Sequence, residues 1–81
     1  MPMDVLLKEI GERVRFFRVL RDIIQTDLAA LVDLDERTIQ RIENGEEPTC
    51  IRTLEKIADV LEIDVDMIIE ASTRPLPPMT E

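Results

Sequence analysis

Charged and amide side chains recur at helical spacing near the middle of this 81-residue chain. Ile39 and Ile42 are three positions apart, so on a helix they face the same side and are predicted to be buried. The polar residues around them then face outward, where guanidinium, carboxylate and amide groups can bond to another molecule. These outward residues are Glu36, Arg37, Gln40, Arg41 and Asn44.

Catalysis and metal binding have little support in the composition. The chain has no His, one Cys (Cys50) and two glycines. Imidazole acid–base chemistry, a zinc site and a glycine-rich phosphate loop are therefore unsupported. The Asp33/Asp35 and Asp64/Asp66 pairs lack the spacing of a calcium loop, and no nucleophile has an adjacent base. We predict a protein that is not an enzyme and uses no metal or cofactor.

Charge and apolar content narrow the class further. Ten basic and eighteen acidic residues give a net charge of -8, so bulk charge alone does not attract a polyanion. With 2% aromatic residues, the chain lacks a stacking platform for single-stranded nucleic acid. No apolar run approaches the roughly 20 residues of a membrane span. The lone Cys and the absence of a basic secretory segment at the N-terminus predict a cytoplasmic protein without a membrane partner.

The spacing of apolar residues predicts five helices and no strand. The helices are expected at about residues 4–21, 25–32, 36–44, from 49 or 50 to 61, and 65–70. Asp4, Asp35 and Asp64 precede helices as N-caps, and Gly45 ends the third helix because glycine readily adopts a positive φ.

The chain divides into one helical domain and a short tail. We assign residues 1–71 to the domain, because a chain of this length holds a single small core. Residues 72–81 contain three prolines and are predicted to form an extended or flexible tail.

A link of about three residues, at 33–35, joins the second and third predicted helices. Leu28 and Leu31 are expected to face inward from the second helix, as Ile39 and Ile42 do from the third. So short a link makes two short helices cross steeply, as in a helix-turn-helix. In the version of this motif that reads DNA, the second helix of the pair lies in the major groove and presents its outer face to the bases.

The stretch from Gln25 to Gly45 resembles the Cro/Xre-type helix-turn-helix of phage repressors and bacterial regulators. Residues 38–45 (TIQRIENG) are its most specific part. Residues 10–15 (IGERVR) and 53–61 (TLEKIADVL) are similar to the family's flanking helices. The resemblance covers residues 10–69 and implies an all-α fold, a compact five-helix bundle of the lambda-repressor-like DNA-binding kind.

The resemblance also implies roles for the residues at matching positions. Gln25 opens the second helix, where the family's Gln holds a phosphate and supports base contacts. Arg37 and Gln40 match base-reading positions, since Arg can bond guanine bidentately and Gln can bond adenine. Arg41 and Asn44 match positions nearer the DNA backbone. The full set of expected DNA-contacting residues is Gln25, Thr26, Glu36, Arg37, Gln40, Arg41 and Asn44.

A further pair of residues matches a structural feature of the family. Arg18 and Glu43 correspond to a salt bridge between the first and third helices. This pair is expected to position the recognition helix and not to contact DNA.

Several residues depart from the family's pattern. Ile24 stands where a Ser or Thr usually caps the second helix, a cap worth about 1 kcal/mol. Glu36 opens the recognition helix, where it can interact with the helix dipole or accept a hydrogen bond from cytosine. Glu46 and Glu47 follow Gly45, where the family usually carries a cation against phosphate.

Two apolar groups are candidates for contact with another chain. Phe16, Val19 and Ile23 form an additional stripe beside the core stripe of the first helix, and they either enlarge the core or form an interface. The fifth helix supplies the second group. The candidate dimer or partner interface is therefore Phe16, Val19, Ile23, Val65, Met67, Ile68 and Ile69.

We predict a sequence-specific double-stranded DNA-binding transcriptional regulator, a repressor, that acts as a homodimer on a palindromic operator. Dimerisation is expected because a single module buries too little surface for tight specific binding. A phage-type regulator and an antitoxin whose tail contacts a toxin both fit this description. The alternative is a helix-turn-helix protein-interaction adapter that has lost DNA binding, which the net charge of -8, the three glutamates and the additional apolar stripe favour.

Overall fold

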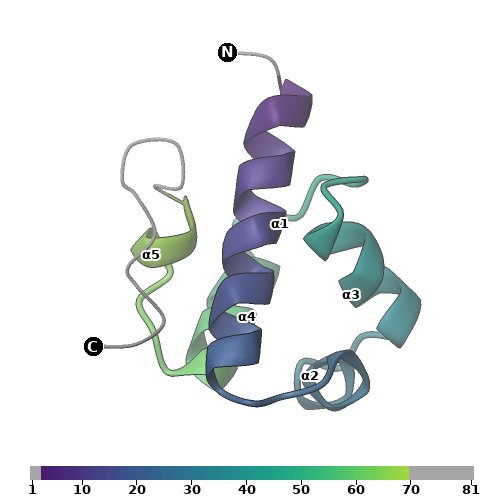
Figure 1. The fold of residues 1–81 in the computed structure, drawn as a ribbon, viewed down its shortest axis with the longest axis vertical. Helices are drawn as coiled ribbons and strands as arrows, with labels where there is room; N and C mark the ends of the chain where they lie inside the picture. The colour runs from purple at the N-terminus through teal and green to yellow at the C-terminus, as the bar shows by residue number, and fades with distance from the viewer. Residues whose placement is uncertain (1–2, 70–81) are drawn as a thin grey trace.

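Five α-helices follow one another along residues 3–69, the part of the chain that the computed structural model describes (Figure 1). They are α1 (Met3–Leu20), α2 (Gln25–Leu31), α3 (Glu36–Glu43), α4 (Ile51–Leu61) and α5 (Asp66–Ile69). Within this range there is no strand, so the predicted all-α five-helix fold is confirmed. No helix in the same range is long and apolar enough to cross a membrane. The predicted tail at 72–81 lies outside the described residues.

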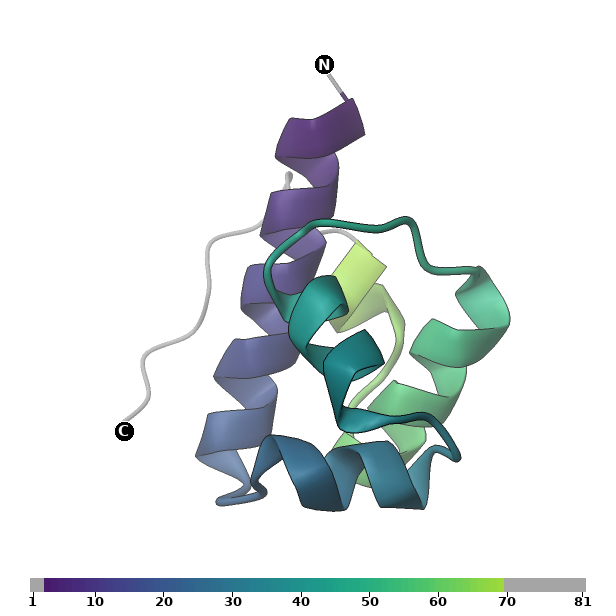
Figure 2. The same cartoon turned by 90° about the vertical axis from the view of Figure 1, so that its right-hand side faces the viewer.

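The longest helix, α1, organises the other four. In both views α2 crosses near the C-terminal end of α1, and α3 lies beside α1 (Figures 1 and 2). α3 also packs on α2, and both α4 and α5 contact α1. The resulting single core is made by Val14, Phe17, Leu28, Ala29, Val32, Ile39, Ile42, Leu54, Ile57, Ala58, Leu61 and Ile68.

The inward face of α2 differs from the prediction at one position. Leu28 is completely buried, but Leu31 is 62% exposed, so the prediction that Leu31 faces inward is wrong. The buried stripe instead continues through Ala29 and Val32. A residue three positions after Leu28 lies about 60° from it around the helix axis, and at Leu31 that is enough to leave the core.

The helix ends depend on residues that accept unusual backbone angles. Asp33 and Gly45 have φ values of 61° and 71°, in the left-handed region where Asp and Gly are tolerated best. α1 begins at Met3, so Asp4 lies within the helix and the prediction that it is the N-cap is wrong. α5 begins at Asp66, one residue later than predicted.

The two glycines allow α1 to approach the end of α3 closely. A Cβ atom at Gly11 would lie 2.3 Å from the backbone oxygen of Ile42 and 2.6 Å from that of Glu43. A Cβ atom at Gly45 would lie 2.7 Å from the Cα atom of Lys8. The last turn of α3 and Gly45, two residues after it, are therefore held directly against the α1 backbone.

The candidate interface residues have different surroundings. Ile68 is completely buried in the core, so its assignment to an interface is wrong: α5 packs on α1 and the monomer itself covers this side chain. Val19 is 48% exposed. The other five are partly buried and pack against the core, namely Phe16, Ile23, Val65, Met67 and Ile69.

Candidate nucleic-acid interface

The helix that carries most of the predicted contact residues, α3, begins at a well-formed cap. Asp35 has extended backbone angles, and its Oδ1 atom accepts a hydrogen bond of 2.8 Å from the backbone N–H of Thr38. Hydrogen bonds from the side chain and the backbone of Thr38 hold the pKa of Asp35 below its ordinary value. The N-cap predicted at Asp35 is therefore confirmed, and it fixes where α3 starts relative to α2.

One face of α3 is apolar and buried, and the other is polar and exposed. Ile39 is completely buried and Ile42 is 3% exposed. The predicted outward residues share the opposite face at spacings of one, three and four positions. All of them are exposed: Glu36, Arg37, Gln40, Arg41 and Asn44.

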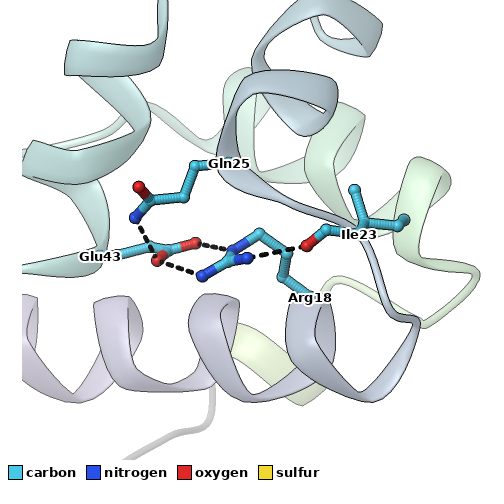
Figure 3. A network of polar contacts seen from close by, with 4 residues as sticks. All are labelled: Arg18, Ile23, Gln25 and Glu43. Carbon is cyan, nitrogen blue, oxygen red and sulfur yellow. Dashed lines mark hydrogen bonds and ion pairs between the residues drawn. The ribbon is translucent and has the colours of Figure 1, made fainter.

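A buried carboxylate joins this helix to the rest of the fold (Figure 3). The Glu43 side chain is 2% exposed and lies beside Arg18, whose side chain is 11% exposed. The Nε and Nη2 atoms of Arg18 donate to the two carboxylate oxygens of Glu43 at 2.6 and 3.1 Å. This bidentate pair between α1 and α3 is the one that the resemblance implies, and such pairs fix orientation as well as distance.

Two further hydrogen bonds extend the pair to the α1–α2 link and to α2. The Nη1 atom of Arg18 donates to the backbone oxygen of Ile23 at 2.7 Å. The side-chain amide of Gln25 donates to Glu43 Oε1 at 3.0 Å (Figure 3). α1, α2 and α3 therefore all contact one carboxylate.

Gln25 thus has a structural bond that its sequence position did not reveal. One N–H of its amide is used by Glu43, and the side chain is half-buried. Thr26, beside it, is exposed. At the preceding position Ile24 is 61% exposed and offers no side-chain cap to α2, as its residue type predicts.

Two other arginines, one in α1 and one directly after it, make structural hydrogen bonds that the sequence does not predict. Arg21 donates to the backbone oxygens of Leu61 and Glu62, at 2.8 and 3.3 Å, and so satisfies carbonyl groups at the end of α4. Arg13 is 5% exposed and donates to the backbone oxygen of Met67 at 3.1 Å. No spacing rule in the sequence identifies these backbone partners.

The electrostatics of the exposed α3 face depend on two arginines. Arg37 forms no ion pair with any residue in the described range 3–69. The Nη1 atom of Arg41 lies 3.6 Å from Glu47 Oε1, in the loop that follows α3, and both side chains of this pair are substantially exposed. The face therefore combines the Glu36 carboxylate, one cation without an ion pair in the described range, one paired cation and two neutral amides.

Comparison with known proteins gives one family and several structures. A family model described as Helix-turn-helix matches residues 14–68. The regulator of clp genes, ClgR, from Corynebacterium glutamicum superposes with a TM-score of 0.80 at 24% identity, covering 88% of this chain and 77% of that one. No curated protein sequence matches the chain significantly.

Two restriction-modification controller proteins also have similar structures. C.AhdI from Aeromonas hydrophila superposes with a TM-score of 0.74 at 27% identity, covering 76% of this chain and 94% of that one. C.Esp1396I superposes with a TM-score of 0.73, also at 27% identity, covering 88% of this chain and 96% of that one.

The buried pair gives a first testable prediction. Arg18→Met leaves the Glu43 carboxylate buried without its cation and should lower the free energy of unfolding by about 3–5 kcal/mol. Arg41→Met is the matched control, because it breaks an exposed pair and should cost about 0–1 kcal/mol. Urea unfolding of the two variants measures both. Equal losses would show that the Arg18–Glu43 pair contributes no more than a surface contact.

The α3 cap gives a prediction about pH. The pKa of Asp35 is lower in the folded than in the unfolded chain, so its carboxylate stabilises the fold above about pH 4. This contribution is lost as the pH falls through the lower, folded value. In urea unfolding, Asp35→Ala should be less stable than wild type near neutral pH, and the gap should close in acid. A gap that stays constant down to about pH 2 would contradict the role of the ionised cap.

Proposed function

The chain belongs to the Cro/C1-type helix-turn-helix family, and from that membership we propose that it is a sequence-specific double-stranded DNA-binding transcriptional regulator. The observation that carries the proposal is the exposed polar face of α3, which is capped at its start by Asp35 and held at its end by Glu43. A helix with one buried and one polar face, fixed at both ends, is suited to the major groove, which admits an α-helix.

Sequence is read by two residues on the exposed face of α3, Arg37 and Gln40. Arg37 is exposed and has no ion pair within residues 3–69, so its guanidinium is available for a bidentate contact with guanine. Gln40 lies three positions later on the same face, with an amide that matches adenine. Glu36, in the first turn, acts mainly on the N-terminal end of the α3 dipole.

Contacts with the DNA backbone position the helix. Arg41 and Asn44 lie at the far end of the exposed α3 face and are assigned to phosphate or sugar, together with Gln25 and Thr26 from α2. The hydrogen bond from Gln25 to Glu43 supports this arrangement, because it orients the Gln25 side chain relative to α3. Such contacts fix register but carry no sequence information.

The regulator acts as a homodimer that represses by occupying a palindromic operator. One domain of this size buries too little surface for tight specific binding, and dimers place two recognition helices about one DNA turn apart. With Ile68 buried, the residues left for the dimer contact are Val19 and the partly buried apolar residues of α1, the α1–α2 link, α5 and the turn before α5. Val19 supports this assignment most directly, because it is an exposed apolar side chain and such side chains cluster at contact surfaces.

A protein-interaction adapter without DNA affinity is the second candidate function. The observation that favours it is the acidity beside the two arginines in sequence: Glu36 precedes Arg37, Glu46 and Glu47 follow Arg41, and Glu47 is paired with Arg41. Phosphate near these carboxylates is repelled.

Selection from a random-sequence duplex library separates the two functions. The regulator should enrich a palindromic motif, and its affinity for that motif should fall steeply as salt rises, because phosphate contacts release counterions. An adapter should enrich no motif even at low salt.

Arg37→Ala tests the assignment of base reading. Binding to the selected duplex should weaken by about 1–3 kcal/mol, and a repeated selection should show relaxed preference at one position of each half-site. Lys56→Ala removes an exposed cation from α4 and serves as the control that leaves the motif unchanged. A variant of Arg37 that binds more weakly but selects the same motif would assign Arg37 to phosphate.

A further inference from the structure

The pair between Arg41 and Glu47 points to a residue that limits DNA affinity. We propose that Glu47 is an internal competitor for the DNA phosphate: its carboxylate occupies the guanidinium of Arg41, and this arginine must leave Glu47 to contact the DNA backbone. The inference rests on the proposed function, since it concerns the face of α3 that was assigned to DNA.

The geometry places the Glu47 carboxylate beside the guanidinium that is assigned to a DNA phosphate. Arg41 Nη1 and Glu47 Oε1 are 3.6 Å apart, and half of the Arg41 side chain is exposed to solvent. The contact uses one guanidinium nitrogen and is longer than a bidentate pair such as that of Arg18 with Glu43. Exposed pairs of this kind are weak, so Glu47 weakens the phosphate contact without abolishing it.

The loop that carries Glu47 is held in place independently of this pair. The backbone N–H groups of Gly45 and Glu46 donate to the oxygens of Ile42 and Arg41, at 3.1 and 2.9 Å. Gly45 has a φ of 71° and packs against the backbone of Lys8 with no room for a Cβ atom. Pro48 follows Glu47, and its ring fixes the φ angle of residue 48 itself. The carboxylate is therefore presented beside α3 by a constrained turn.

The neighbouring residue Glu46 distinguishes competition for Arg41 from general repulsion of DNA. Glu46 carries the same charge one position away but is exposed and has no ion pair within the described part of the chain. A general repulsion of DNA would involve both glutamates, whereas competition for Arg41 involves Glu47 alone. This difference makes Glu46 a matched control.

Glu47→Gln should tighten binding by about twofold to fivefold per protomer at about 0.1 M salt. Because phosphate contacts are independent of sequence, the gain should be equal for the selected duplex and for a scrambled duplex. The dependence of affinity on salt should become steeper by up to about one unit of the log–log slope, because in the wild type the released Glu47 binds a cation of its own. Glu46→Gln should change affinity by less than about twofold.

The same substitution in an Arg41→Ala background separates competition from bulk charge. In that background Glu47→Gln should tighten DNA binding by less than about twofold, because no guanidinium remains to be released. An equal gain in both backgrounds would overturn the proposal and assign the effect to general repulsion. A gain confined to the selected duplex would also overturn it, by placing Arg41 on a base.

Failure of this inference and failure of the proposed function give different results. If the wild type binds a selected motif and Glu47→Gln binds no more tightly, only the competition is wrong. If neither the wild type nor the variant enriches any motif, the proposed function and the competition are both wrong. Urea midpoints of the variants close to wild type confirm that all of them are folded, since each change is on the surface.

Discussion

The orientation of α3 depends on one buried carboxylate, that of Glu43. A carboxylate that is almost fully removed from water is costly unless its charge is paired and its oxygens are hydrogen-bonded. Both oxygens accept bonds from Arg18 of α1, and one also accepts a bond from Gln25 of α2. Moving α3 relative to α1 or α2 breaks these bonds. Because these hydrogen bonds must be kept while the charge is buried, the network fixes the angle between the helices of the motif.

Close backbone packing completes this constraint at the C-terminal end of α3. Gly11 admits the backbone oxygens of Ile42 and Glu43, and Gly45 turns the chain away against Lys8. The N-terminal end is fixed by Asp35. The exposed face between these ends consists of side chains only, so it can accept different residues without loss of the fold. Fold and site are separable here, and the function has to be argued from the side chains.

The net charge of -8 leaves few cations that could attract DNA over a distance. Glu43 neutralises the charge of Arg18, whereas Arg13 and Arg21 donate to neutral backbone oxygens and keep their charge. Several acidic residues lie on α4 and in the turn that follows it, away from the exposed face of α3 in sequence. Of the two arginines on that face, Arg41 is shared with Glu47. Affinity in the proposed complex thus depends strongly on base contacts and dimerisation, and less on long-range attraction.

The sequence predicts the fold well because its signals are local. Helical periodicity, the Asp35 cap and the left-handed turns at Asp33 and Gly45 each involve residues within a few positions of one another. The errors concern tertiary surroundings: Leu31 and Ile68 are both apolar, and only the packing of the other helices decides that one is exposed and the other buried.

The site is predicted in part for the same reason. The outward face of α3 follows from periodicity, and the Arg18–Glu43 pair follows from the family resemblance. The bonds of Gln25 to Glu43, of Arg21 to the end of α4 and of Arg41 to Glu47 link side chains to partners that no spacing rule identifies. The tight fit at Gly11 is equally invisible in sequence, because a glycine within a helix does not reveal which backbone approaches it.

The proposed function requires that DNA binds at the exposed face of α3. Amide chemical-shift mapping of the ¹⁵N-labelled protein, titrated with the duplex obtained by selection, locates the surface that binds. The largest shifts should fall on residues 36–44 and on the first residues of α2, with small shifts along α4. Shifts concentrated on α4 and α5, with the α3 face unchanged, would contradict it.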